Sequence, residues 1–318
     1  MDDERIRRIF RPFYQRRLKD LAKKQARFAY YTSATTGMNI LKGQTLWLRA
    51  AACMNDYREI GYGIQMLNQA IYSSAQRRAR IERLAGDLHW DGEILPRLLG
   101  DMNQNEQNLI THTYLACVSE YDRGDGWRGR LSMWRAYGRK TGVALVLKAG
   151  SFLQSTQKIP LQFQPVEYLD YDAFVRRLDW VLSNIERHEE ELSQQSPGAV
   201  LEIFLDSIRN SLFSIKHPGF HEEREWRIIC QESNKALPYE IESVDGVPQI
   251  VYKLPLLVPG ENGKAGLDLD DVLDCVLIGP SQYAEVVHAA FVKQLETMGL
   301  ASPRERVAVS NIPLREEK

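Results

Sequence analysis

The segment Glu223–Cys230, with the sequence EREWRIIC, alternates so regularly that it constrains the fold of the whole chain. Successive side chains of an extended strand point to opposite faces. One face receives Glu223, Glu225, Arg227 and Ile229, and the other receives Arg224, Trp226, Ile228 and Cys230. The second face is largely apolar and must be covered by other parts of the chain. The pattern therefore predicts a sheet strand with one buried face and one charged face.

Further strand and helix patterns follow one another in a mixed order. Extended runs lie at 28–33, 45–49, 112–119, 142–147, 165–168, 225–231, 249–254, 272–278 and 306–309. Helical stretches lie at 34–41, from Asn55 or Asp56 to about Leu84, and at 93–109, 131–138, 172–193, 199–213 and 282–298. This order favours an α+β fold with a mixed or antiparallel sheet over a doubly wound one. The chain contains neither GxGxxG nor GxxxxGKS/T, so it indicates neither a Rossmann site nor a P-loop.

We expect a basic N-terminal arm, residues 1–27, followed by one α+β domain, residues 28–318. Within the domain, helical insertions are predicted near 56–109 and 172–213. The arm holds ten basic and four acidic side chains and reads as helix interrupted near Pro12. Such a run is either a solvated helix face or a surface that contacts a polyanion or an acidic partner.

Composition argues against several classes of protein and of binding site. The chain has 318 residues, enough for one large domain or two small ones. Its formal net charge of −1 argues against bulk electrostatic binding of nucleic acid. The four cysteines are far apart and form no CxxC pair, which argues against a zinc ribbon. No apolar run approaches the length of a membrane span, and we expect a cytoplasmic protein.

The charged face of the Glu223–Cys230 strand has two interpretations. Arg227 could bridge Glu223 and Glu225 in a structural salt-bridge strip, or the two carboxylates could belong to a functional site. Upstream segments add polar groups. Tyr30 and Thr32 share a face of strand 28–33, Ser119 ends strand 112–119, and Trp134 and Tyr137 lie on one stripe of helix 131–138. We expect these groups to form a polar cleft.

These runs together resemble a known family. The chain reads YYTSATTGMNIL, LWL and NDYRE, then CVSE, MWRAYG and GVALVL, then FHEEREWRII. In this combination and order the runs look like the bacterial domain-of-unknown-function family 2971. The resemblance spans about Tyr30 to Cys230, with a family-like tail near Val272–Pro280. The family setting implies a role as a toxin or in phage defence.

The layout of that family is in turn similar, by analogy of fold, to the ADP-ribosyltransferases. The similarity implies that Tyr30 and Thr32 take the first substrate-binding position and that Ser119 takes the second. It also implies that Glu225 is the catalytic carboxylate, with Glu223 before it as in Glu-x-Glu transferases. Tyr30 stands where the pattern has a histidine. A tyrosine hydroxyl can hydrogen-bond a substrate but cannot carry a positive charge.

The resemblance further implies that NAD is the substrate and that the site needs no metal. Glu225 would stabilise an oxocarbenium-like transition state, and Glu223 would orient or deprotonate the acceptor, an unknown protein or nucleic acid. Other roles are implied for Trp134 or Tyr137, which would stack on nicotinamide, and for Arg227 or Arg135, which would meet the pyrophosphate. Further candidate site residues in the NDYRE run are Asn55, Asp56 and Glu59.

Two other functions stay open. The basic arm and the cluster Arg77, Arg78, Arg80 and Arg83 favour a metal-dependent nuclease or a nucleic-acid-binding effector, in which acidic pairs would hold Mg²⁺. A non-catalytic binding module with a structural polar strip is the third interpretation. His217 and His221 are four residues apart, but the intervening Pro218 and Gly219 argue against a helix, so no metal site is predicted there.

Overall fold

The computed structural model describes residues 1–53, 58–90, 94, 96, 98–100, 106–121, 126, 128–138, 140–156, 159, 161–231, 237–244, 246–257 and 266–312. The chain forms two compact units, each assembled from three separate stretches. The first, called the helical unit here, comprises Met1–Lys19, Ala51–His112 and Gln164–His221. The second, the sheet unit, comprises Asp20–Ala50, Thr113–Phe163 and Glu222–Lys318. Most of the basic arm and both predicted helical insertions fall in the helical unit.

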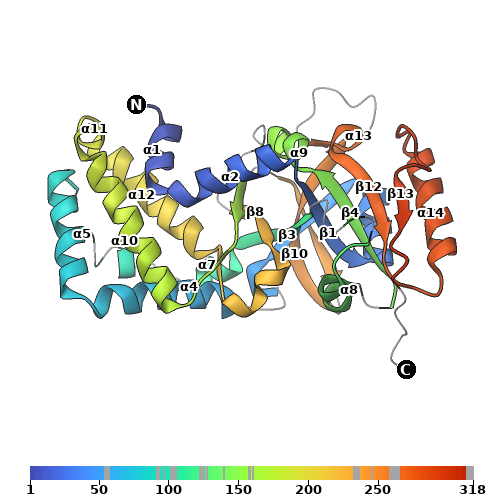
Figure 1. Ribbon diagram of the computed structural model, residues 1–318, viewed down its shortest axis with the longest axis horizontal. Coiled ribbons are helices and arrows are strands. Elements are labelled where there is room, and N and C mark those ends of the chain that lie inside the picture. The colour runs from blue at the N-terminus through green and yellow to red at the C-terminus, as the bar shows by residue number, and fades with distance from the viewer. Residues whose placement is uncertain are drawn as a thin grey trace. The chain divides into compact units, whose positions relative to one another are not determined.

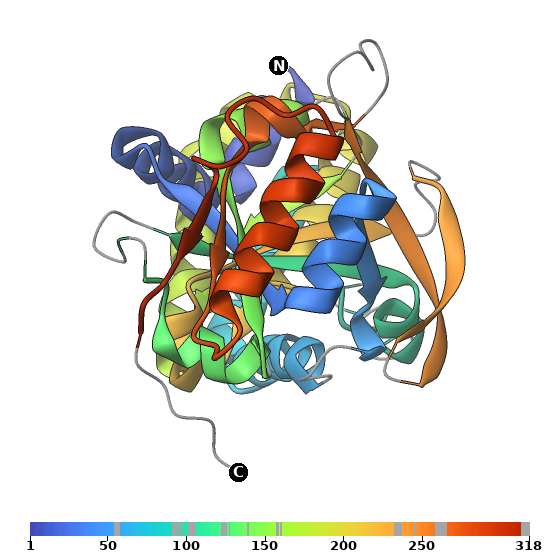
Figure 2. The ribbon, with the colours of Figure 1, turned by 90° about the vertical axis from the view of Figure 1, so that its right-hand side faces the viewer.

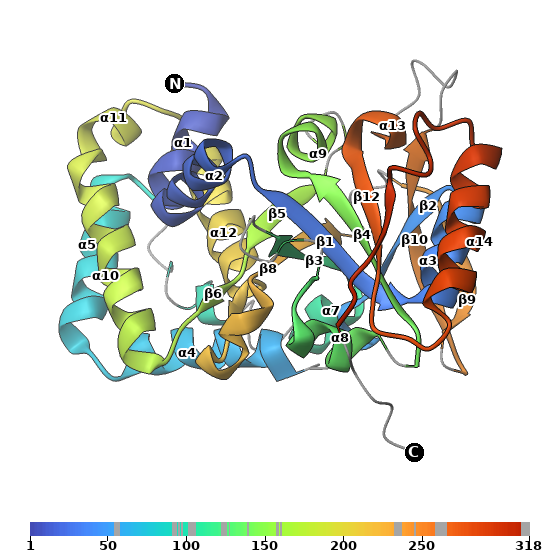
Figure 3. The same cartoon turned by 45° about the vertical axis from the view of Figure 1, so that its right-hand side comes forward.

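The sheet unit is built on a mostly antiparallel open sheet, which confirms the predicted α+β class. Its strands are β1 (Arg27–Ser33), β2 (Thr45–Ala50), β3 (Thr113–Tyr121), β4 (Gly142–Lys148), β8 (Glu225–Gln231), β9 (Tyr239–Val244), β10 (Val247–Leu257), β11 (Leu267–Asp268), β12 (Leu273–Ile278) and β13 (Val307–Val309). The main strand order is β11-β10-β2-β3-β1-β4-β12-β13, with β8 beside β3 and β9 beside β10. Figure 3 shows β1, β4 and β12 next to one another. Strand β5 (Gln162–Pro165) spans the sequence boundary between the units.

The helices that accompany this sheet among the described residues include α3 (Ala34–Gly43), α8 (Leu131–Tyr137), α9 (Ala149–Thr156), α13 (Leu269–Val272) and α14 (Ala284–Thr297). Figure 2 shows α3 and α14 running side by side. Helix α3 begins where the Ser33 hydroxyl accepts a hydrogen bond from the Thr36 N–H, at 3.1 Å. It ends at Gln44, whose left-handed backbone (φ 50°) closes the helix after Gly43. This short connection returns the chain to the sheet as β2.

Aromatic side chains fill both faces of the sheet. On one face, the Trp134 ring of α8 meets the Tyr31 ring edge-on, with centroids 4.8 Å apart. The Trp134 indole N–H donates to the Arg128 carbonyl at 2.8 Å. On the opposite face, Trp226 stacks on Phe163 with centroids 4.9 Å apart. The predicted core face of β8 is confirmed, because Trp226, Ile228 and Cys230 are fully buried.

The helical unit contains α1 (Asp3–Phe10), the first part of α2 (Pro12–Lys24), η1 (Ala51–Cys53), α4 (Arg58–Tyr72), α5 (Ala75–Asp87), α7 (Glu106–Thr111), α10 (Tyr171–Arg187), α11 (Glu189–Ser193) and α12 (Pro197–Leu212). Two short parallel strands, β6 (Glu167–Tyr168) and β7 (Ile215–Lys216), join them. Helix α1 packs against α10 and α12, as Figure 1 shows. The Phe204 ring of α12 packs against the rings of Phe10 and Trp90, with centroid distances of 5.4 and 4.9 Å respectively.

The prediction of a single long helix up to about Leu84 is wrong, because the helix is interrupted. Two helices, α4 and α5, take its place, with a break at Ser73 and Ser74. The Ser74 side chain accepts a hydrogen bond from the Arg77 N–H at 3.2 Å and so caps a new helix. The proposed cap residues Asn55 and Asp56 lie outside the described residues. Among the described helices, none is long and apolar enough to cross a membrane.

Candidate functional site

The sheet splits along the middle of β3. β1 pairs with β3 only through Arg27, Phe28 and Ala29, at the end of β3 near Tyr121. β2 pairs with the opposite end of β3, through Arg49 and Ala50. Both strands use the same edge of β3, because β8 occupies the other edge over its whole paired length. β1 and β2 therefore leave β3 in a fork, which helix α3 connects.

Pairing register decides which predicted site residues share a face. Ser119 lies opposite Ala29 on one side and opposite Glu225 on the other, and Cys117 lies opposite Arg227. Directly opposed residues point to the same face of a sheet. Ser119, Glu225 and Arg227 therefore share a face, as the alternation in the sequence predicts for Glu225 and Arg227.

Tyr30 and Thr32 lie on the other face of β1. They alternate with Ala29, which is the residue in register with Ser119. Part of the Thr32 side chain faces helix α3, because a methyl group built on Gly37 would lie 3.7 Å from its methyl carbon. Within β1 they therefore point away from the side of Ala29, while the Tyr30 hydroxyl lies near enough to Cys117 and Arg49 for both to affect its pKa.

Glu225 and Arg227 form a buried ion pair. Arg227 Nε donates to Glu225 Oε1 at 2.8 Å, and Arg227 Nη2 donates to Oε2 at 3.4 Å. Only 7% of the Glu225 side chain and 3% of the Arg227 side chain are exposed. An arginine at this distance favours the charged form of a carboxylate. The pair therefore holds a carboxylate in one orientation on the charged face of β8.

Glu223 does not continue the strand, which differs from the predicted segment Glu223–Cys230. The short helical turn Pro218–Glu223 precedes β8, and Arg224 between them has φ 44°, in the left-handed region. This turn breaks the alternation, so strand geometry does not place Glu223 on the same face as Glu225. Its carboxylate accepts a hydrogen bond from the Tyr137 hydroxyl at 3.4 Å. Glu223 and Tyr137, both candidate site residues, are thus brought together at the start of β8.

Arg130, which the sequence analysis did not single out, fixes this region. Its guanidinium donates to the Glu222 carbonyl at 2.9 Å and to the Glu223 carbonyl at 3.3 Å. Its backbone N–H donates to the Tyr31 hydroxyl at 3.2 Å. Arg130 therefore connects the start of α8 to the turn that carries Glu223. No local pattern marks it, since its partners are backbone carbonyls far away in the sequence.

Ser119 and Trp134 are packed inside the sheet unit. The Ser119 side chain is 2% exposed, and its hydroxyl points at the Met133 sulfur, 4.0 Å away. Trp134 is 4% exposed and lies so close to Gly279 that a methyl group there would come within 2.7 Å of its ring. Arg135, on the same helix, is exposed. Trp134 therefore packs as core, whereas Tyr137 is half-buried.

A second group of polar side chains gathers where β1 and β2 leave β3. Burial raises the pKa of the Tyr30 hydroxyl to about 12, with a further increase from Cys117 and an opposing effect from Arg49. Arg49 Nε donates to Gln249 Oε1 at 3.0 Å. The sequence patterns did not identify Arg49 or Gln249, because they lie on strands whose pairing partners are distant in the chain.

The remaining candidates can be placed briefly. Asn55 and Asp56 lie outside the described residues, and so does the side chain of Glu59, whose backbone is in α4. No group of three or more histidine, cysteine, aspartate or glutamate side chains among the described residues is arranged to hold a metal ion. Burial raises the pKa of the Cys230 thiol to about 11 and that of the Cys275 thiol to about 12. Both thiols therefore stay protonated at neutral pH and pack as small apolar groups.

Three arginines of the α5 cluster form ion pairs within the helical unit, and Arg78 donates to the carbonyls of Ile71 and Tyr72. Arg77 Nε pairs with Asp179 at 3.0 Å, and Arg80 makes a two-pronged contact with Glu186 at 2.6 and 2.8 Å. Arg83 pairs with Asp87 and also with Glu186. Ion pairs of this kind leave little net positive charge for a polyanion.

Comparison with known protein families matches part of the chain. The model of the protein family of unknown function DUF2971 matches residues 133–228, from α8 to the middle of β8. The match confirms the resemblance to this family and covers the residues Trp134, Tyr137, Glu223, Glu225 and Arg227. No curated protein and no solved structure matches the chain.

Proposed function

We propose that the chain is an ADP-ribosyltransferase-like enzyme that takes NAD as substrate and transfers ADP-ribose to an acceptor. The observation that carries the proposal is the buried pair of Glu225 and Arg227 on the charged face of β8. The fork of β1 and β2 at β3 supports the finer proposal of an ADP-ribosyltransferase-like sheet. It divides the sheet beside the strand that positions Glu225.

The pair has a cost that packing alone does not explain. Burying two charges requires the loss of their hydration, and replacing such a pair by apolar residues of similar size is often neutral or stabilising. Perturbed or buried charged groups accordingly cluster at functional sites. A fixed carboxylate on the face of a sheet supports a reaction in which positive charge develops nearby.

ADP-ribosyl transfer is such a reaction. The bond between the nicotinamide nitrogen and C1 of the ribose breaks, and its electron pair leaves with nicotinamide. The ribose then resembles an oxocarbenium ion until the acceptor atom donates an electron pair to C1 and loses its proton. In the proposal, Glu225 stabilises the positive charge on the ribose, and Arg227 holds the carboxylate in place. Removing one such preorganised group reduces rates by about 10²- to 10³-fold.

Glu223 and Tyr137 supply the second part of the proposed site. Glu223 is half-buried and precedes Glu225 by two residues in the sequence. The left-handed turn at Arg224 excludes it from the strand. Its hydrogen bond to the Tyr137 hydroxyl gives the carboxylate a defined position. We assign Glu223 to the acceptor, whose proton it accepts. Trp134 is left out of the proposed site because its ring is already packed.

The proposal is tested with NAD labelled in its adenylate part and with protein, RNA and DNA acceptors. Wild type is compared with Glu225→Gln, which keeps an oxygen for Arg227 but removes the negative charge. Glu242→Gln is the matched control, because Glu242 also pairs with a cation on the same sheet, Lys253, at 2.5 Å. The proposal predicts transfer of label by wild type and by Glu242→Gln, and its loss in Glu225→Gln.

Three results would contradict the proposal. Absence of both transfer and NAD hydrolysis in the wild type removes the transferase. Metal-dependent cleavage of the RNA or DNA acceptor that disappears in Glu225→Gln assigns the residue to a nuclease instead. A lower melting temperature for Glu225→Gln with no activity in any variant assigns the strip to a non-catalytic module.

A further inference from the structure

A cavity lies within the helical unit, apart from the β8 site in sequence and in chemistry. All of its lining residues come from this unit, chiefly from the α1–α2 junction, α10, α12 and the segment around β6. Its volume is about 70 Å³. That is roughly five times the room that one water requires by this measure. The cavity is therefore large enough for a small organic molecule.

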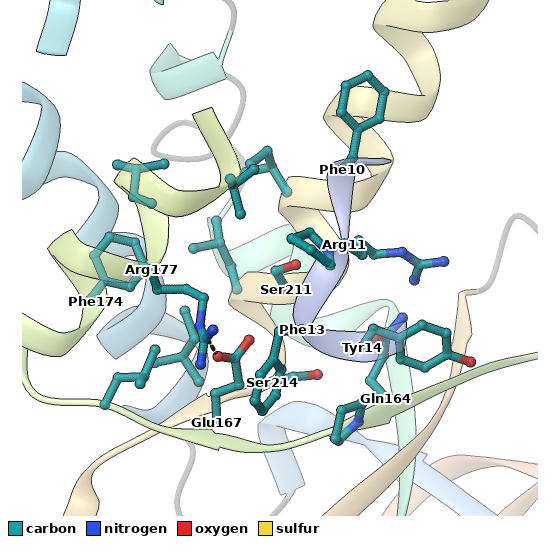
Figure 4. Close-up of a pocket in the computed structure, with 18 of the residues that line it drawn as sticks. Phe10, Arg11, Phe13, Tyr14, Gln164, Glu167, Phe174, Arg177, Ser211 and Ser214 are labelled. Atoms are coloured by element: carbon teal, nitrogen blue, oxygen red, sulfur yellow. Dashed lines mark ion pairs between the residues drawn. The ribbon is translucent and has the colours of Figure 1, made fainter. Parts of the chain in front are cut away.

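Most of the wall is apolar, with Phe10, Phe13, Phe174 and Leu178 among the lining residues. The charged part of the wall consists of two guanidinium groups, Arg11 and Arg177, and one carboxylate, Glu167. Figure 4 shows Glu167 and Arg177 facing one another, with Arg11 and Tyr14 together on another side. Glu167 and Arg177 thus pair within the wall, and Arg11 lies apart from them.

Arg177 has its partners inside the cavity wall. Its Nε lies 2.5 Å from Glu167 Oε2. The guanidinium also lies over the Phe13 ring, 4.2 Å from the ring centroid, and 5.0 Å from that of Trp180. This side chain is thus held by a carboxylate and two aromatic rings.

Arg11 lacks such a carboxylate. Its Nε is buried and has no hydrogen-bond partner among the described residues. The Tyr14 ring lies 4.9 Å from the guanidinium carbon. Burial lowers the pKa of Arg11, and the attraction of Glu4 and Asp206 opposes this only in part. Both of those acids hydrogen-bond other arginines, Glu4 to Arg8 and Asp206 to Arg209.

The backbone keeps Arg11 at this place. Arg11 is the residue between α1 and α2, where its N–H donates to the Arg7 carbonyl at 3.0 Å and Pro12 starts the next helix. An arginine cannot lose its charge under physiological conditions. A buried charge without a partner costs several kcal/mol, and buried charges in proteins are normally paired. Arg11 is half-buried and its Nε is fully shielded, so an anionic partner from outside the chain would offset part of the hydration that the guanidinium has lost.

We propose that this cavity binds a small organic monoanion, a carboxylic acid with a short apolar or aromatic body, whose carboxylate pairs with Arg11. The Arg11 guanidinium matches one anionic group, because Glu167 and Arg177 face each other elsewhere in the wall. The aromatic and aliphatic wall matches an apolar body rather than a bare inorganic ion. The site is independent of the proposed transferase reaction, so either can fail without the other.

Isothermal titration calorimetry with hexanoate and benzoate as probes tests the proposal. Hexanol and inorganic phosphate serve as comparison ligands, the first without charge and the second without an apolar body. Wild type is expected to bind the two acids and to bind hexanol and phosphate at least tenfold more weakly. Loss of one charge-assisted pair corresponds to roughly 10- to 100-fold in affinity. Arg11→Met should therefore weaken hexanoate binding by that factor.

Arg16→Met is the matched control, because Arg16 lies on the same arm and is exposed. It should bind hexanoate as wild type does. In the absence of ligand, Arg11→Met should melt at or above the wild-type temperature, since it removes a partly buried charge whose Nε has no hydrogen-bond partner among the described residues. Equal binding of hexanol and hexanoate would reduce the site to an apolar void. Phosphate binding as tight as hexanoate, unchanged binding by Arg11→Met, or no binding of either acid would each overturn the proposal. The ligand comparison in wild type remains a test even if Arg11→Met does not fold.

Discussion

Arg227 donates two hydrogen bonds to Glu225, two residues earlier on the same strand, in a pair that is almost completely shielded from solvent. Both residues lie on one face of the strand, so the strand itself sets their separation. The pair links the charged face predicted from the sequence to the site proposed from the structure.

Removing the cation should be more damaging than neutralising the carboxylate. Arg227→Met takes the guanidinium away from a buried carboxylate, for which we expect a loss of about 3–5 kcal/mol in the free energy of unfolding. Glu225→Gln keeps a hydrogen-bond acceptor for Arg227 and should cost less. Urea denaturation of both variants measures the difference. Equal or opposite losses would show that another group compensates one of the two charges.

Glu167 should make the stability of the helical unit depend on pH. Burial raises the pKa of its carboxyl from 4.5 to about 7, and the attraction of Arg177 and of Arg17 only partly opposes this. Between these two values the folded chain holds a proton that the unfolded chain has released. Raising the pH through this range therefore favours unfolding. The effect amounts to at most about 3 kcal/mol.

Glu167→Gln should remove this dependence. Unfolding free energies measured at pH 5 and pH 8 test the prediction, and wild type should lose more stability than the variant over that interval. If wild type instead gained stability relative to Glu167→Gln as the pH rises, the ion pair with Arg177 would outweigh burial and the direction of the shift would be wrong.

Trp134 should behave as a core residue. Trp134→Ala removes a ring that contacts Tyr31 and sits against Gly279, and we expect a loss of about 3–5 kcal/mol. Arg135→Ala, on the exposed side of the same helix, should change stability by no more than about 0.5 kcal/mol. Thermal unfolding of the two variants provides the comparison. A small effect of Trp134→Ala would return the ring to the group of candidate ligand contacts.

Arg80 separates the structural from the nucleic-acid interpretation of the α5 cluster. Its guanidinium is held by Glu186 and donates to the Ser183 hydroxyl at 2.7 Å. Arg80→Gln should therefore lower stability by about 1 kcal/mol and leave RNA and DNA retention unchanged. Filter binding at two salt concentrations checks the second part. Weaker, less salt-dependent retention in the variant would show that Arg80 contacts phosphate.

Local patterns were sufficient to predict most of the sheet. The strands around Tyr30, Leu145 and Val276 are apolar or regularly alternating, and the structure places β1, β4 and β12 there. β9 was missed because its sequence, YEIESV, alternates carboxylates with residues that are largely exposed, as Ile241 is. An edge strand of this kind depends on its partner β10 rather than on its own burial.

The candidate site was less accessible to sequence reasoning. Alternation correctly places Glu225 and Arg227 on one face, but the left-handed Arg224 removes Glu223 from the strand. The place of Tyr30 relative to Ser119 depends on the pairing of β1 with β3, which connects residues about ninety positions apart. Interleaving of the two units is likewise determined by long-range contacts and has no local signal.

Nicotinamide release from NAD, measured at saturating NAD for wild type, Glu225→Gln and Glu242→Gln, tests the central claim most directly. We expect release by wild type, a similar rate for Glu242→Gln, and a rate about 10²- to 10³-fold lower for Glu225→Gln, with all three proteins folded. Wild-type protein that releases no nicotinamide with any acceptor, or Glu225→Gln that releases it at the wild-type rate, would contradict the account.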